Sequence, residues 1–184
     1  DFLKSVLVLV SGTVLAQAIG YLVSPFLTRI YSAEEMGELG MYMRLVGFFS
    51  ALATARFELA IPLPKSDNDS FLLYKLSLRI TKMVLLSLMV LLISFYFIKP
   101  LRLNEFVFGV FSIISTLFVV YINLGTNWSI RKSYFKKISH QRIINSFTAN
   151  GLKWVFGIFS MGSFGLILAT LIGFFFSSLG FIRD

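Results

Sequence analysis

The chain has 184 residues, of which 57% are hydrophobic and 16% aromatic, and it carries a formal net charge of +8. Soluble domains are about 45–50% apolar, so a water-soluble chain of this size could not cover so much apolar surface. The composition excludes an ordinary soluble domain, and the lack of cysteine excludes disulfides and thiolate metal sites within these residues.

Long apolar runs predict an all-α fold, a polytopic membrane helix bundle. A helix needs about 20 mostly apolar residues to cross a bilayer, which gives about six transmembrane helices here. We expect them at 6–27, 36–63, 80–98, 106–127, 143–159 and 164–182. The triplet at 16–18 resembles a signal-peptide cleavage site, but the apolar run continues beyond it, so we interpret the first helix as retained.

The first expected helix has one polar or small face. It is formed by residues at helical spacing, which are Thr13, Gln17, Gly20, Ser24 and Thr28. Such a face either packs tightly against another helix or lines a hydrated cavity. The sequence leaves both readings open. Ser32 and Glu35 then predict a capping box at the start of the second helix.

The second expected helix carries Arg44, Arg56 and Glu58. A charge at the bilayer centre costs about 2.5–3.5 kcal/mol, so such residues usually face a bundle interior or a water-filled path. On a continuous helix, Arg44 and Glu58 would lie about 40° apart. We interpret Arg44 as the best candidate for an anion site, whereas Arg56 could also extend to the lipid headgroups.

Later segments add polar features. The fourth helix carries Ser112, Thr116, Asn123 and Asn127 at near-helical spacing, for interhelical hydrogen bonds or a wet interior. The fifth is the weakest, because its first half is polar. A basic amphipathic segment with Lys75, Arg79 and Lys82 precedes the third helix, and a basic loop is expected at 131–142. Both suit anionic membrane lipids, or serve only as topology anchors.

Basic residues gather in alternate connections. The positive-inside rule then places both termini in the cytoplasm. The same interleaving with apolar runs fits lipid headgroups rather than nucleic acid, so we expect no nucleic-acid partner. The sequence contains no phosphate-binding glycine loop, metalloprotease motif or nucleophile–base pair, and the single His140 lies in the basic loop. We therefore expect a protein that is not an enzyme and has no cofactor.

Several segments resemble a known family. They are SGTVLAQ at 11–17, SPFLTRIYS at 24–32, EEMG at 34–37, ARFELAIPLP at 55–64 and GSFGLIL at 162–168. Together they resemble the polysaccharide-biosynthesis (Wzx-like, O-antigen) flippases of the multidrug/oligosaccharidyl-lipid/polysaccharide exporter superfamily. Those proteins have about twelve or more transmembrane helices in two lobes, so residues 1–184 correspond to the N-terminal six-helix lobe. The resemblance implies a fragment of a longer protein, or a half that needs a second copy.

The resemblance also implies a function. It would be the flipping of undecaprenyl-diphosphate-linked oligosaccharide by alternating access, in a bacterial inner membrane, with H+ or Na+ as a possible coupling ion. On that basis Arg44, Arg56 and Arg29 would attract the diphosphate or acidic sugars. Gln17, Asn123 and Asn127 would bind sugar hydroxyls, and Glu58 would pair with Arg56 or another helix.

Three other readings stay open. A lipid II flippase is close in chemistry. A multidrug antiporter needs an intramembrane carboxylate, which the first helix does not have. The third alternative is a structural membrane protein whose polar faces serve only assembly.

Overall fold

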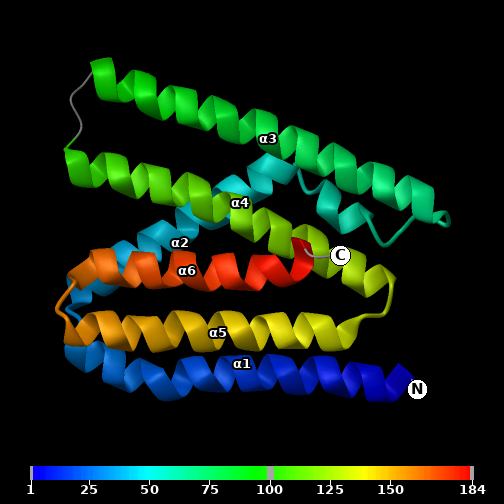
Figure 1. The fold of residues 1–184 in the computed structure, drawn as a ribbon, viewed down its shortest axis with the longest axis horizontal. Helices are drawn as coiled ribbons and strands as arrows, with labels where there is room; N and C mark the ends of the chain where they lie inside the picture. Colours follow the sequence, from blue (N-terminus) through cyan, green and yellow to red (C-terminus); the bar gives the residue numbers. More distant parts are fainter. Residues whose placement is uncertain (1, 99–101, 183–184) are drawn as a thin grey trace.

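The described part of the chain is an all-α bundle of six long helices. A computed structural model describes residues 2–98 and 102–182. The helices are α1 (Phe2–Ile30), α2 (Ala33–Thr54), α3 (Asp67–Ile98), α4 (Leu103–Arg131), α5 (Phe135–Ile158) and α6 (Gly162–Ile182), with a short 3-10 helix, η1 (Phe57–Ala60). Figure 1 shows α1, α5 and α6 side by side, α3 beside α4, and α2 crossing obliquely behind α6 and α4.

Four of the helices are long and apolar enough to cross a membrane. They are α3, α4 and α6 over their whole lengths, and α1 from Leu7 onward. Their length and composition indicate a multi-pass membrane protein. The all-α class predicted from the sequence is confirmed within the described residues.

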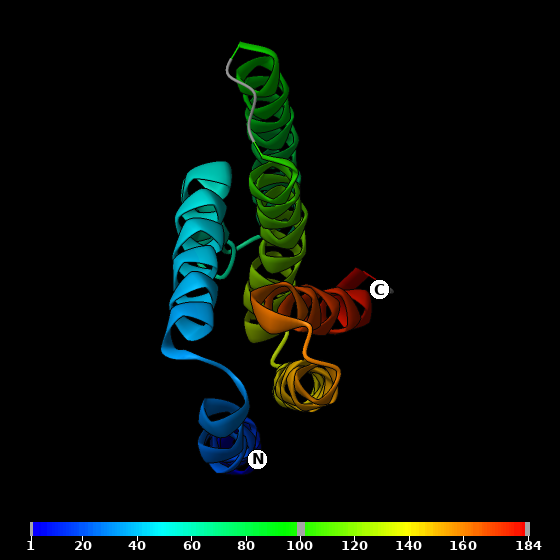
Figure 2. The ribbon, with the colours of Figure 1, turned by 90° about the vertical axis from the view of Figure 1, so that its left-hand side faces the viewer.

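The helices α2 and α5 are less apolar than the other four and are not among those that are apolar enough to cross a membrane. Each carries charges or amides along its length, including Arg44 in α2 and Lys153 in α5. Both lie between other helices: α2 packs on α3, α4 and α6, and α5 packs between α1 and α6. Figure 2 looks nearly along α1 and α5 and shows α2 rising from the level of α1 towards α3 and α4. Each of these two polar helices therefore packs on several neighbours, although one face of α2, with Arg44, stays exposed.

The second helix is shorter than the sequence suggested. The expected range was 36–63, but α2 ends at Thr54, where Ala55 (φ 48°) and Arg56 (φ 61°) both adopt the left-handed conformation. The 3-10 helix η1 follows. Arg44 and Glu58 therefore do not share one continuous helix, and the angle calculated for them does not apply.

The predicted start of α2 is confirmed. The Ser32 side chain accepts a hydrogen bond from the Glu35 backbone N–H (3.2 Å), and the Glu35 carboxylate accepts one from the Ser32 backbone N–H (2.7 Å). This capping box satisfies two N–H groups that the first turn would otherwise leave unpaired. Glu35 also lies beside the start of α6, because a Cβ on Gly162 would be 2.9 Å from Glu35 Oε1.

The expected basic loop at 131–142 is mostly helical. α4 continues to Arg131 and α5 begins at Phe135, so only residues 132–134 connect them. The reason is burial: Ile138 is 1% exposed and Gln141 7% exposed, which holds this segment in the bundle.

The third helix, α3, is continuous from Asp67 and is about 48 Å long at 1.5 Å per residue. This length exceeds a hydrocarbon core of about 30 Å, so a membrane crossed upright by α3 would cover only part of the helix.

Buried side chains join α2 to both neighbouring groups. Tyr42 is fully buried, and its hydroxyl donates to the Phe111 carbonyl of α4 (3.2 Å) and contacts Ser115 Oγ. It also belongs to a core cluster with Val46 of α2, Ile167 and Phe174 of α6. This cluster fixes α2 between α4 and α6.

Candidate functional site

The candidate site is built on the contact between α1 and α5. Small residues let these helices approach closely: a Cβ on Gly12 would overlap the Cβ of Ser139 and lie 3.0 Å from its Cα. Ser139 Oγ donates to the Val8 carbonyl (2.8 Å), and Ser146 Oγ donates to the Ala16 carbonyl (2.6 Å). Hydroxyls on α5 thus bond the backbone of α1 over two helical turns.

The end of α1 is tied to the same helix. Tyr31, 5% exposed, donates its hydroxyl hydrogen to the Lys153 carbonyl at 2.7 Å. Burial, and secondly the Glu35 carboxylate, raises the pKa of the Tyr31 hydroxyl above its usual range. The hydroxyl therefore stays neutral and keeps the proton that it donates.

A polar cavity of about 540 Å³ opens along this contact. It is lined mostly by α1 and α5, and also by Met43 of α2 and by Thr170 and Phe174 of α6. Volumes of about 300–1,000 Å³ are typical of small-molecule sites. Its polar residues are Thr13, Gln17, Arg142, Asn145, Ser146, Asn150, Lys153 and Thr170.

The charge of this cavity has one sign. Arg142 and Lys153 line it, whereas no carboxylate is among the described residues that do. Arg142 donates to Thr13 Oγ1 (2.6 Å), which positions the guanidinium at the α1–α5 contact. The two residues are about 16 Å apart along the helix at 1.5 Å per residue. The cavity can therefore attract an anion at two separate points and offer amides and hydroxyls between them.

The structure places the residues of the face predicted on α1 in different surroundings. Thr13 and Gln17 line the polar cavity. Gly20 instead approaches α5, since a Cβ there would be 3.9 Å from Asn150 Nδ2. Ser24 and Thr28, further along, are exposed. One half of the face thus packs and lines the cavity, and the other half is open.

The remaining residues proposed from the sequence lie apart from one another. Arg44 is exposed in the middle of α2, one residue beyond Met43 of the cavity wall. Arg29 is exposed in the last turn of α1, and Arg56 is exposed at the break after α2. In α4, the Asn127 side chain donates to the Asn123 carbonyl (2.9 Å), and both residues are half-buried. Of the seven substrate-binding residues proposed from the sequence, Gln17 alone lines the cavity.

Glu58 has a different environment from the one expected. It is 2% exposed within η1, and its Oε2 has no hydrogen-bond partner among the described residues. Neither ion pair found in the described part of the chain involves Glu58 or Arg56, since both join Asp67 to the basic end of α4 and the residue after it. The expected pairing of Glu58 with Arg56 is therefore absent from this conformation.

Sequence reasoning missed the contribution of α5. Its polar residues were interpreted as weakening a transmembrane helix, although Arg142, Asn145, Ala149 and Lys153 follow each other at steps of three or four. That spacing places them on one helix face and could have revealed the cavity wall. No metal site is evident, since no group of three or more His, Asp or Glu residues occurs in the described ranges.

Comparisons of the chain with protein-family models, with curated proteins and with solved structures found no match.

Proposed function

We propose that this chain is the N-terminal lobe of a transporter that flips a lipid-linked, anionic oligosaccharide across a bacterial inner membrane. The observation that carries the proposal is the cavity along α1 and α5, which has two cations and no described carboxylate in its wall. A diphosphate-linked sugar chain combines negative charge with many hydroxyls. Arg142 and Lys153 suit the charge, and Gln17, Asn145 and Asn150 suit the hydroxyls.

An exposed face of α2 supports a second wall. Arg44, Gly37 and Gly47 are exposed on it and Gly40 is half-buried, and a Cβ added at any of these glycines would meet no atom within 4 Å. A charged residue within an apolar helix is costly when it faces lipid. A second lobe, or a second copy of this chain, would cover Arg44 and close the transport path.

The cavity chemistry also separates this proposal from the alternatives. Two cations in the wall disfavour the organic cations that a multidrug antiporter binds, because like charges repel. A lipid II flippase would use the same diphosphate chemistry, so it remains the second candidate. In a structural membrane protein the polar residues would serve assembly only, as the Arg142 hydrogen bond to Thr13 between α1 and α5 does, and their loss would lower the amount of folded protein.

The test compares charge-removing variants in the source bacterium. Arg142→Gln, Lys153→Gln and Arg44→Ala are introduced into the full-length gene product, with Lys136→Gln as control because Lys136 is exposed on α5 and lies outside the cavity wall. We expect surface polysaccharide to fall at least tenfold in the first three, at unchanged membrane abundance. Normal export in the Arg142 and Lys153 variants would refute the anion site. A parallel fall in abundance would support the structural alternative.

A further inference from the structure

A second cavity, of about 380 Å³, lies where α2, α3 and α4 meet. Ser112 is the one polar residue among the described residues that line it, and its hydroxyl donates to the Phe108 carbonyl (2.8 Å). Leu91 (63% exposed) and Phe95 (51% exposed) line it on α3, so the cavity opens at the surface of the bundle. We call it the apolar groove.

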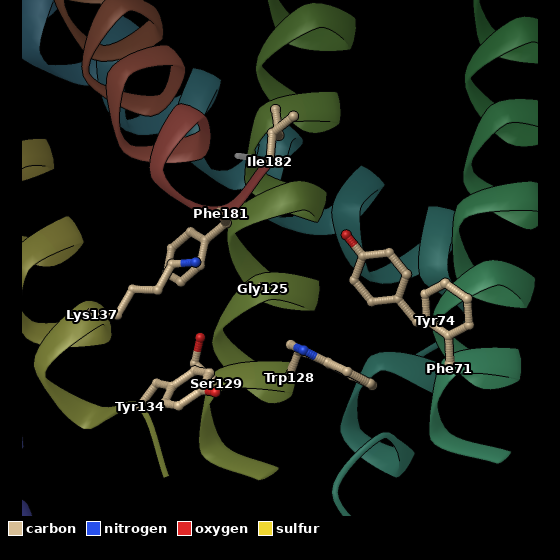
Figure 3. Close-up of a pocket in the computed structure, with 9 residues that line it drawn as sticks. All are labelled: Phe71, Tyr74, Gly125, Trp128, Ser129, Tyr134, Lys137, Phe181 and Ile182. Carbon is tan, nitrogen blue, oxygen red and sulfur yellow. The ribbon is translucent and has the colours of Figure 1, made fainter. Parts of the chain in front are cut away.

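The groove differs from a third cavity, which Figure 3 shows at the end of the bundle where α3 begins and α6 ends. In that cavity, Ser129 and Lys137 lie among aromatic rings. The apolar groove instead lies along the second half of α3 and the first half of α4, and both helices are apolar enough to cross a membrane. Such a groove suits hydrocarbon, because a polar ligand would lose its hydrogen bonds to water and find few partners in the wall.

One helix, α2, lines both the apolar groove and the polar cavity between α1 and α5. Met43 lines the polar cavity, and Leu45 lines the groove. Because successive residues of a helix are about 100° apart, Arg44 lies between these two residues, on the exposed face. Tyr42 and Val46 are buried on the other side of the helix. A path over the exposed surface of α2 from the polar cavity to the groove therefore passes Arg44.

The two flanks of Arg44 differ in chemistry. On the side of the polar cavity, Gly40 and Gly47 lie within about 60° of Arg44, and a Cβ added at either would meet no atom within 4 Å. On the side of the groove, Met41 (59% exposed) and Phe48 (63% exposed) lie within about 60° of it. The surface of α2 thus changes from open space to apolar side chains across one cation.

We propose that the apolar groove holds the hydrocarbon tail of the anionic lipid-linked cargo, whose diphosphate lies between Arg44 and the α1–α5 cavity. This inference rests on the proposed function, because it needs a cargo with an apolar tail and an anionic head. Groove, cation and polar cavity follow each other around α2 in the order of tail, diphosphate and sugar in one molecule. This order favours the cargo over a phospholipid of the bilayer, which has no sugar chain.

The test follows the tail directly. The full-length protein in phosphatidylcholine nanodiscs is given geranylgeranyl diphosphate with a diazirine near the end of its tail, and the residues that are cross-linked on illumination are identified by mass spectrometry. We expect cross-links within 88–95 of α3 and 108–113 of α4. Excess unlabelled geranylgeranyl diphosphate should reduce them at least tenfold, whereas phosphatidylglycerol added to the nanodisc should leave them unchanged.

Two leucines of α3 provide a matched pair of variants. Leu91 is 63% exposed and lines the groove, whereas Leu86 is 67% exposed and lies outside its wall. Leu91→Trp should fill part of the groove and lower the cross-linking at least tenfold, and Leu86→Trp should leave it unchanged. Arg44→Gln should weaken competition by the unlabelled diphosphate about tenfold, which corresponds to about 1.4 kcal/mol. Circular dichroism checks that each variant keeps its helices.

Three results would overturn the proposal. Cross-links that excess geranylgeranyl diphosphate does not reduce would mean that the chains of bilayer lipids fill the groove. An equal loss in Leu86→Trp would mean that the tail lies on the surface of α3 in general. Cross-links confined to other helices would place the tail elsewhere. Because the probe has no sugar, each of these results is compatible with loss of export in the Arg142 and Lys153 variants. Normal export in those variants, together with specific cross-links in the groove, would refute the anion site of the proposed function and leave the tail site standing.

Discussion

Replacing Gly12 with alanine tests whether α1 is held to α5 by close approach. The added Cβ would overlap the Cβ of Ser139 and would lie 3.0 Å from its Cα, which is backbone and cannot rotate away. The two helices must therefore move apart or deform. Overpacking of this kind costs about 1–3 kcal/mol.

Gly151→Ala is the matched control. Gly151 lies on α5, and a Cβ there would meet no atom within 4 Å. Both substitutions raise helix propensity by up to about 1 kcal/mol, so this gain cancels in the comparison. The difference between the two variants should then equal the steric cost, with Gly12→Ala less stable by about 1–3 kcal/mol.

The assay is equilibrium unfolding of the purified chain in mixed dodecyl maltoside and dodecyl sulfate micelles, followed by circular dichroism and by tryptophan emission. Trp154 of α5 is 49% exposed and reports on the environment of that helix. If Gly12→Ala and Gly151→Ala unfold at the same detergent ratio, α1 is not held by the contact described, and the geometry of the α1–α5 cavity loses its basis.

Three further changes test other contacts. Tyr31→Phe removes the 2.7 Å hydrogen bond to the Lys153 carbonyl and should cost about 0.6 kcal/mol in the same assay, the average for such bonds in membranes. Arg131→Ala should lower the melting temperature more than Asp67→Asn does, because Arg131 also donates to the Pro64 carbonyl (2.6 Å); the reverse order would show that the ion pairs dominate. Glu58→Leu should raise stability by about 1–3 kcal/mol, since an unpartnered buried oxygen is removed; a decrease would mean that Glu58 has a partner in solution.

The sequence predicted the fold class well because apolar runs of helical length are a strong signal. It also predicted the capping box of Ser32 and Glu35, which depends only on residues three apart. It did not predict the end of α2 at Thr54, because neither Ala55 nor Arg56 is a residue that favours the left-handed conformation. The break depends on tertiary contacts around η1, including the burial of Glu58 and Ile61.

The candidate site was harder to predict for a related reason. Arg44 was chosen because it is a charged residue in an apolar run. Such a residue can be recognised from its own helix, but the residues of other helices that lie near it cannot. The cavity residues Gln17 and Arg142 come from helices far apart in the chain and meet only because Gly12 and Ser139 let α1 and α5 touch. Pairing of helices is a tertiary property, and it is not visible in the local patterns of one sequence.

The residues that join α1 to α5 are far apart along the chain, and this distance affects the synthesis of the protein. The bonds from Ser139 to Val8, Arg142 to Thr13 and Ser146 to Ala16 link residues 131, 129 and 130 positions apart. At about 5–20 residues per second, a ribosome needs roughly 6–26 s to synthesise that length. During this time α1 has been synthesised but its partner has not. Until α5 is made, the surface of α1 that α5 later covers lacks this partner, and slower elongation between α1 and α5 would lengthen that interval.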